Sequence, residues 1–268
     1  MPLSARRTAN TLRARDFTSP SPLDRRTRYC NSPREQRATF AKTVLARPLA
    51  DPVGTYSYSN SGCGLLSAII ERTADAEYEE LMGVKIFAPL GLKTARFGAP
   101  ATLGKIDQPW GHYRDEGERL TPAEPVPENQ FPPALTPAAS VHVSFSDFAR
   151  FAAWVSSVEP KLVSAETRNR LQTPPSGGSY AGGMWMTEMP GIGGKAVCHC
   201  GHMGGPFGVF HAGPKIACVA VFNTAGGGWE WVGDEISAAA GIKLPDEGTA
   251  ESLPLGLRSR NQHCFSMR

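Results

Sequence analysis

The chain has 268 residues, of which 41% are hydrophobic and 20% are charged, and its formal net charge is +3. Since a domain usually takes ~100–200 residues, this length and apolar content fit one globular body and exclude a second large domain. No apolar run approaches the ~18 residues of a membrane span and no secretory signal is present, so we expect no membrane span and, for the chain as written, a cytoplasmic location.

The first residues differ in composition from the rest. Residues 1–37 hold nine Arg against three acidic residues, a local charge of +6 that leaves −3 for the remainder. Arg, Ser, Pro and Thr crowd together without apolar periodicity, so this stretch buries too little surface to offset the entropy of ordering. We therefore predict that residues 1–38 are disordered or non-native. A nucleic-acid arm, a transit peptide and translation of a GC-rich gene in the wrong frame are alternatives to a solvated tail, and we expect no nucleic-acid partner.

Ordered sequence begins near Thr39 with three helices. Phe40, Val44 and Leu45 lie on one helical face before Pro48, which predicts a short first helix. Two longer helical patterns follow and predict two packed helices. They consist of Leu65, Leu66, Ile69 and Ile70, and of Tyr78, Leu81, Met82 and Ile86 before Pro89.

The middle of the chain combines an irregular segment with one well-marked helix. Residues 99–140 are rich in Pro and polar groups, and we interpret them as a surface excursion that walls a binding cleft, with no regular element. Ser144 and Asp147 form a capping box that opens an amphipathic helix. Its buried side should comprise Phe148, Phe151, Ala152 and Val155.

Short apolar runs separated by Gly and Pro then predict an antiparallel meander. These runs are Met184–Met186, Ala196–Cys200, Pro206–His211 and Ile216–Phe222, and Trp229, Val232 and Ile236 mark a closing helix. Helices followed by consecutive strands indicate an α+β layer fold. Residues 244–268 show no pattern and are predicted to form a C-terminal tail.

Four motifs, in this order, resemble those of the serine β-lactamase and penicillin-binding-protein family, closest to its class C, esterase and D-aminopeptidase-like branch. They are Pro52-x-Gly54 leading into Tyr58-Ser59-Asn60-Ser61-Gly62, then Ile86–Leu92, then Pro137-Ala138-Ala139-x-x-His142-Val143-Ser144, and His199-Cys200-Gly201 with Pro214 and Asn223 beyond. The resemblance covers residues 39–243. It implies a partial β-lactamase/transpeptidase-like fold, an antiparallel sheet flanked by helices, in which the N-terminal strands and the Ser-x-x-Lys helix are missing.

The resemblance also implies roles for single residues. In this family a Ser and a Lys one helical turn apart meet a Tyr-x-Asn or Ser-x-Asn motif and a Lys-Thr-Gly or His-x-Gly motif. Tyr58 would be the catalytic base, a role that requires cations to lower its pKa from ~10. Asn60 would bind the substrate amide, and the N-cap of the next helix is its structural alternative. His199 and Gly201 would form the third motif, with the backbone N–H of His202 as an oxyanion-hole donor.

Two alternatives surround His199. His202-Met203-Gly204 is another register for the third motif, although starting there shortens both strands of the hairpin that leads to Pro214. Cys198-His199-Cys200-x-His202 also suggests zinc. Because side chains alternate across a strand, Cys198 and Cys200 point one way and His199 the other, so we expect no metal and no cofactor.

The family's nucleophile is not found. No Ser in the sequence is followed three positions later by Lys, and Thr39-Phe40-Ala41-Lys42 has the spacing but lies in the helix next to the Tyr58 motif. Loss of the nucleophile in a serine protease costs on the order of 10⁶ in kcat, so we expect an inactive or impaired chain.

Three functions follow, each with a small acyl compound as partner. The first is a truncated or frame-disrupted serine hydrolase for an ester, amide or β-lactam. The second is a non-catalytic module that keeps Tyr58, Asn60 and His199 as a ligand pocket. The third is an enzyme that uses Tyr58 or His199 directly.

Overall fold

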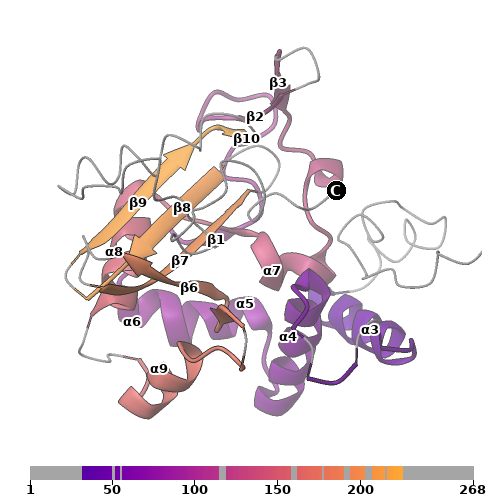
Figure 1. Cartoon of the computed structure of the whole chain (residues 1–268). Helices are drawn as coiled ribbons and strands as arrows, with labels where there is room; N and C mark the ends of the chain where they lie inside the picture. The colour runs from indigo at the N-terminus through magenta and orange to yellow at the C-terminus, as the bar shows by residue number, and fades with distance from the viewer. Residues whose placement is uncertain are drawn as a thin grey trace, which may run out of the picture.

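Five antiparallel strands form the largest sheet (Figure 1). The computed structural model describes residues 32–49, 52–54, 56–114, 119–157, 162–176, 178–189, 194–202, 207–214 and 216–225. Within these residues the sheet has the order β5-β6-β7-β8-β9. Its strands are β5 (Tyr180–Ala181), β6 (Met184–Met189), β7 (Gly194–His202), β8 (Phe207–Ala212) and β9 (Ala217–Phe222). The predicted meander and the α+β class are confirmed.

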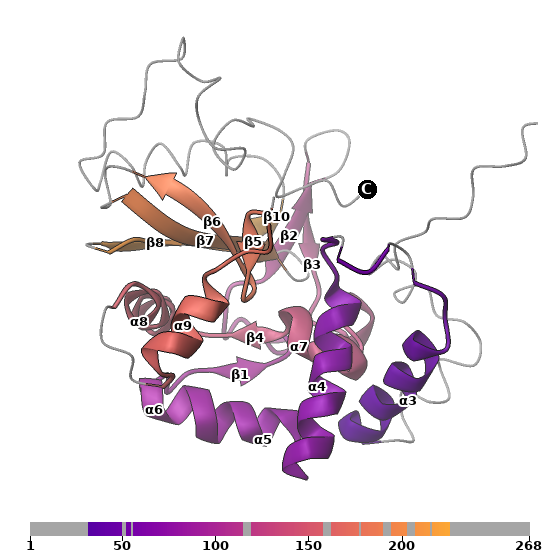
Figure 2. The ribbon, with the colours of Figure 1, turned by 60° about the horizontal axis from the view of Figure 1, so that its bottom comes forward.

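The helix opened by Ser144 covers one face of this sheet. The Ser144 hydroxyl accepts a hydrogen bond from the backbone N–H of Asp147 at the start of α8 (Phe145–Ser156), which confirms the predicted helix start. The reciprocal half of the capping box is replaced, because the Ser144 N–H donates to Thr94 Oγ1 and the Asp147 carboxylate accepts from Thr94. The buried residues of α8 pack against Val197 and Ala212 of the sheet. Figure 2 shows α8 and α9 (Ala165–Leu171) on this side of the sheet. Burial of these apolar side chains therefore holds α8 against the sheet, and the two form adjacent layers.

Regular structure also occurs in the Pro-rich segment 99–140, where none was predicted. β2 (Gly111–Arg114) pairs with β3 (Leu120–Ala123) and, in parallel, with β10 (Thr224–Ala225). Three short helical turns follow: η2 (Pro127–Asn129), η3 (Pro133–Leu135) and α7 (Thr136–Ala139). A Pro stands near the start of each turn, a position that tolerates its missing N–H. The segment also reaches the core, since Leu135 is fully buried.

The first described helix, α3 (Pro33–Leu45), begins earlier than the apolar pattern indicated. Ser32 and Glu35 form a reciprocal capping box around Pro33 at the first helical turn. Residues 33–38, which composition grouped with the Arg-rich segment, are thus helical, because Ser-Pro-x-Glu is a helix start as well as a polar run. Residues 1–31, the predicted closing helix and the tail 244–268 lie outside the described residues.

The next helix, α4 (Asn60–Ala74), buries its small and polar face. Its apolar side chains Leu66, Ile69 and Ile70 are about half exposed, at 59%, 52% and 46%. The buried residues are Ser61, Gly64, Ser67 and Glu71. The predicted packing through the apolar stripe is therefore wrong for the described part of the chain.

The close packing of α4 against α3 and η3 explains why α4 buries the face that carries Gly64. A Cβ atom added at Gly64 would lie 2.7 Å from the carbonyl oxygen of Ala134 and 2.9 Å from the ring of Phe40. Only a residue without a side chain allows α3 and η3 to approach α4 so closely. The helical run then continues through α5 (Tyr78–Met82), the π-turn η1 (Gly83–Phe87) and α6 (Ala88–Leu90).

A two-stranded sheet lies near the helical run from α5 to α6, on the side of the main sheet that α8 covers. β1 (Arg96–Phe97) pairs with β4 (Val141–His142) in an antiparallel arrangement. Figure 2 shows β1 and β4 between the α8 level and the run from α5 to α6. Among the helices that the structure describes, none combines the length and the apolar character required to cross a bilayer.

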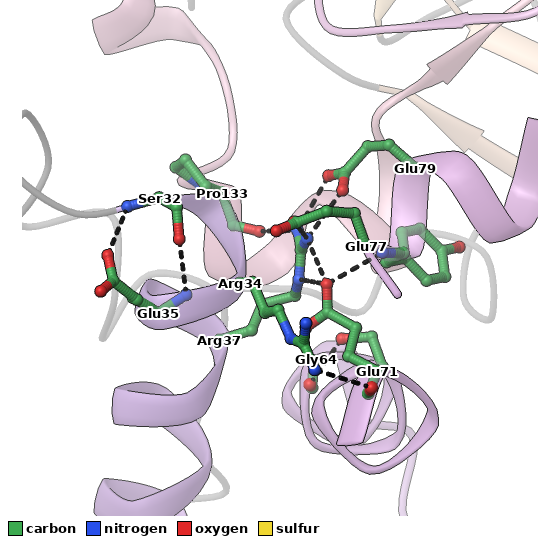
Figure 3. A network of polar contacts seen from close by, with 11 residues as sticks. Ser32, Arg34, Glu35, Arg37, Gly64, Glu71, Glu77, Glu79 and Pro133 are labelled. Atoms are coloured by element: carbon green, nitrogen blue, oxygen red, sulfur yellow. Dashed lines mark hydrogen bonds and ion pairs between the residues drawn. The ribbon is translucent and has the colours of Figure 1, made fainter. Parts of the chain in front are cut away.

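A buried arginine joins α3, α4 and α5 (Figure 3). Arg37 is fully buried, and its Nε and Nη2 atoms donate to Oε1 of Glu71 at 3.0 and 2.6 Å. Its Nη1 and Nη2 atoms donate to the carboxylate of Glu79 at 2.8 and 2.7 Å, and Nη1 also donates to the carbonyl of Pro133 at 3.1 Å. Glu71 Oε1 further accepts the backbone N–H of Tyr78 at 2.9 Å. One guanidinium thus fixes the helix whose N-terminus carries Tyr58-Ser59-Asn60.

Candidate functional site

The Tyr58-Ser59-Asn60 motif stands at the N-terminus of α4. Ser59 is the N-cap, because its hydroxyl accepts a hydrogen bond from the backbone N–H of Gly62 at 3.0 Å. Asn60 is the first helical residue and is half-buried. Since Ser59 takes the capping role that was the structural alternative for Asn60, the Asn60 carboxamide is left for other hydrogen bonds.

His199 lies on β7, where its backbone faces Phe210 across the strand pair. Its side chain is half-buried. The Nδ1 atom of His199 is buried and has no hydrogen-bond partner within the described residues. Burial lowers the pKa of His199, and a hydrogen bond with the backbone of Gly183 opposes this shift. The imidazole is therefore neutral at pH 7.

Gly201 and His202 occupy the end of β7. They face Gly208 and Phe207 on β8, whereas β6 pairs with β7 only over residues 194–198. Gly201 and His202 therefore lie beyond the described pairing of β6 with β7. The side chain of His202, the alternative register for the third motif, lies outside the described residues.

Tyr180 brings Tyr58 and His199 to one place. Its ring centroid lies 5.7 Å from that of Tyr58, in an edge-on arrangement, and 6.3 Å from that of His199. Trp185 contacts the same ring at 4.8 Å, and Tyr56 does so at 5.6 Å. The helical part of the chain and the sheet thus meet at an aromatic cluster that contains two of the predicted site residues.

A tight hairpin holds Tyr180 in this position. Tyr180 pairs with Trp185 across β5 and β6, and the two residues at the turn, Gly182 and Gly183, have φ values of 55° and 83°. Such values suit the two-residue turns that match strand twist and favour glycine. A Cβ atom at Gly182 would also overlap the carbonyl oxygen of Leu171. The same turn therefore places both Tyr180 and the backbone group that hydrogen-bonds His199.

The surroundings of Tyr58 favour its protonated form. Burial raises the pKa of Tyr58, and the nearby Cys63 thiol raises it further. Burial is also the main cause of the raised pKa of Tyr180, followed by Tyr58 and Tyr56. Among the described residues, no cationic side chain is a cause of either pKa shift. Tyr58 can thus donate a hydrogen bond at neutral pH, whereas the role of base, which requires a lowered pKa, stays a prediction.

An acidic cluster elsewhere resembles a metal site but has a different role. Among the described residues, Glu71, Glu77 and Glu79 bring one ligand atom each to within 4.8 Å of one another. The Arg37 guanidinium already lies among these oxygens, at 2.6 Å from Glu71, 3.6 Å from Glu77 and 2.7 Å from Glu79. This cluster is an ion-pair network that stabilises the helices.

The sequence pattern did not identify Tyr180, Trp185 or Cys63 as site residues. The usable signal was Tyr180 two positions before Gly182-Gly183, which marks a hairpin with an aromatic pair across its strands. Thr39 and Lys42, which have the spacing of the family's nucleophile, are both exposed on α3.

The lowered pKa of His199 gives a testable pH dependence of stability. The unfolded chain takes up this proton at ~6.5, a higher pH than the folded chain, so the free energy of unfolding should fall as the pH drops below ~6.5. The free energy of unfolding stops falling once His199 is protonated in the folded chain as well. Urea unfolding at a series of pH values should therefore show a smaller decline for His199→Gln than for the wild type. An equal decline in the two proteins would contradict the burial of a neutral His199.

The chain is similar to one protein family and to several solved structures. The family model described as Beta-lactamase matches residues 11–241, a range that begins inside the segment set apart by composition. The octameric penicillin-binding-protein homologue from Pyrococcus abyssi is 25% identical with a TM-score of 0.62, over 78% of this chain and 48% of that one. FmtA from Staphylococcus aureus is 18% identical with a TM-score of 0.58, over 76% and 56% of the two chains.

A third solved structure is similar in extent. The D-stereospecific amidohydrolase from Streptomyces sp. is 15% identical with a TM-score of 0.59, over 81% of this chain and 64% of that one. The chain thus spans about half to two thirds of the length of these solved relatives. No curated protein matches it. These likenesses confirm the fold that the four sequence motifs predicted.

Proposed function

Because the chain belongs to the β-lactamase family, we propose that Tyr58, Asn60, Tyr180 and His199 line a site for the acyl part of a small amide, ester or β-lactam. The observation that carries this proposal is the meeting of Tyr58 and His199 at one ring, 5.7 and 6.3 Å from their centroids. Amides are the first choice of ligand, since the solved relatives include a D-amino acid amidase and a D-stereospecific amidohydrolase.

Each side chain has a role that its protonation state allows. The Tyr58 phenol, protonated because burial raises its pKa, donates a hydrogen bond to the ligand carbonyl. The Asn60 carboxamide both donates to and accepts from the ligand amide. The buried Nδ1 of His199, which has no hydrogen-bond partner among the residues that the structure describes, gains one when a polar ligand enters. The backbone of Gly201 and His202, beyond the described pairing of β6 with β7, would offer N–H groups to the ligand carbonyl oxygen.

Acylation requires a group that the sequence does not supply. Hydrolysis through an acyl-enzyme uses a Ser with a Lys one turn away, and this chain has no such pair. We therefore propose that this chain binds the ligand. Catalytic turnover would require a protein that has both these binding residues and the Ser-x-x-Lys nucleophile. Fluorescent penicillin is expected to leave the purified chain without a covalent label on a denaturing gel, with a penicillin-binding protein as positive control. A labelled band at the mass of the chain would contradict this assignment.

Ligand binding itself tests the site. Isothermal titration calorimetry with D-alaninamide should give a saturable signal for the wild type. Loss of one hydrogen bond typically costs ~0.5–1.5 kcal/mol, so Tyr58→Phe and Asn60→Ala should each weaken binding by about threefold to tenfold. Ser57→Ala, which removes an exposed hydroxyl next to the motif, should leave the Kd unchanged. Equal affinities for all four proteins would rule out the proposed site.

A further inference from the structure

The ring of Tyr180 contacts the rings of both Tyr58 and His199. Aromatic rings in contact have centroids about 4.5–7 Å apart, and both separations, 5.7 and 6.3 Å, fall in this range. No further ring-sized group fits between Tyr58 and Tyr180 or between Tyr180 and His199. A ligand that reaches both Tyr58 and His199 must therefore place its substituent beside the Tyr180 ring.

Tyr180 is also held firmly. Trp185 packs edge-on against it at 4.8 Å from the strand on one side, and Tyr56 contacts it at 5.6 Å from the chain before α4. The Gly182 turn below it is wedged against the backbone of Leu171. Displacing the ring would break these contacts, so it does not yield to a bulky substituent at low energetic cost.

From this geometry we infer that Tyr180 is the specificity-determining residue of the site and limits it to acyl groups with small substituents. The inference rests on the proposed function. It selects α-amino acyl amides whose side chain is no larger than a methyl group and excludes those that carry a benzyl group. Replacing Tyr180 with Ala removes the ring and leaves an aromatic-lined space, and such apolar spaces in protein cores accept benzene-sized groups.

Two amides that differ only by a phenyl group test this limit. Isothermal titration calorimetry of the full chain should show that the wild type binds D-alaninamide more tightly than D-phenylalaninamide. In Tyr180→Ala the ratio of the two Kd values should shift toward D-phenylalaninamide by about tenfold or more, a typical range for pocket-size discrimination. Tyr180→Phe keeps the ring and should keep the wild-type preference. Ser57→Ala, which removes an exposed hydroxyl next to the motif, should keep it as well.

The outcomes separate the two proposals. A folded Tyr180→Ala protein with an unchanged ratio overturns the size limit and leaves the proposed function standing. If neither the wild type nor Tyr180→Ala binds either amide, the proposed function fails, and the size limit fails with it. Tyr180→Leu provides a second variant with a smaller apolar side chain, and circular dichroism identifies which variants are folded. In a folded Leu variant a shift in the same direction as that of Ala supports the limit, and an unchanged ratio overturns it.

Discussion

Replacing Arg37 with Ala is expected to lower the free energy of unfolding by about 3–5 kcal/mol, because removing one partner of a buried ion pair leaves the other charge uncompensated. Arg37 is fully buried and donates to Glu71, Glu79 and the carbonyl of Pro133. Loss of Arg37 would leave the Glu71 carboxylate without its cationic partner, although the Glu71 side chain is only 2% exposed. Urea unfolding followed by circular dichroism measures the change.

Arg34 on the same helix provides the matched control. It pairs with Asp75 at 2.7 Å, but its side chain is 35% exposed and that of Asp75 is 90% exposed. Exposed pairs contribute little to stability, so Arg34→Ala should lower the free energy of unfolding far less than Arg37→Ala does. Similar losses for the two variants would show that the Arg37 network does not hold α3 against α4.

Gly182→Ala should destabilise the chain by about 2–5 kcal/mol. An Ala at a left-handed φ costs roughly 1–2 kcal/mol, and overlap of its Cβ with the Leu171 carbonyl adds roughly 1–3 kcal/mol of overpacking. Because the same turn carries Tyr180 and the backbone partner of His199, the variant should also lose affinity for D-alaninamide. Thermal unfolding and calorimetry measure the two effects.

Gly183→Ala isolates the effect of backbone strain. Gly183 also has a positive φ, 83°, but a Cβ atom there would meet nothing within 4 Å. We expect a loss of only about 1–2 kcal/mol for this variant. Equal destabilisation by the two substitutions would contradict the close approach of the hairpin to Leu171.

Local patterns predicted the part of the fold that local forces determine. The α8 helix follows from a Ser144 cap and an apolar face, both of which lie within a few residues of each other in the sequence. The strands β6 to β9 follow from short apolar runs separated by Gly and Pro. In both cases the residues that predict the element are the residues that form it.

The face that α4 buries depends on distant residues and was not predictable in the same way. Its pattern of Leu66, Ile69 and Ile70 indicated an apolar core contact, yet the helix packs through Gly64 and Glu71. Glu71 is buried because Arg37, from another helix, pairs with it. An ion pair between helices leaves no periodic signal in either helix, so hydrophobic periodicity alone selects the wrong face.

The candidate site shows the same division. Tyr58, Asn60 and His199 could be proposed from motifs, because their residue types and order match those of a known family. Tyr180 could not, because its position depends on a hairpin that meets the chain before α4 from a distant part of the sequence. Motif matching also could not show that burial raises the pKa of Tyr58.

Aromatic ¹H–¹³C NMR spectra recorded during a titration with D-alaninamide test most directly whether Tyr58, Tyr180 and His199 line one binding site. We predict that resonances of these three rings shift together and fit a single Kd, while His142, whose Nδ1 hydrogen-bonds the carbonyl of Gly98 away from the cluster, stays unchanged. Shifts confined to other residues, or different Kd values for Tyr58 and His199, would contradict a shared site.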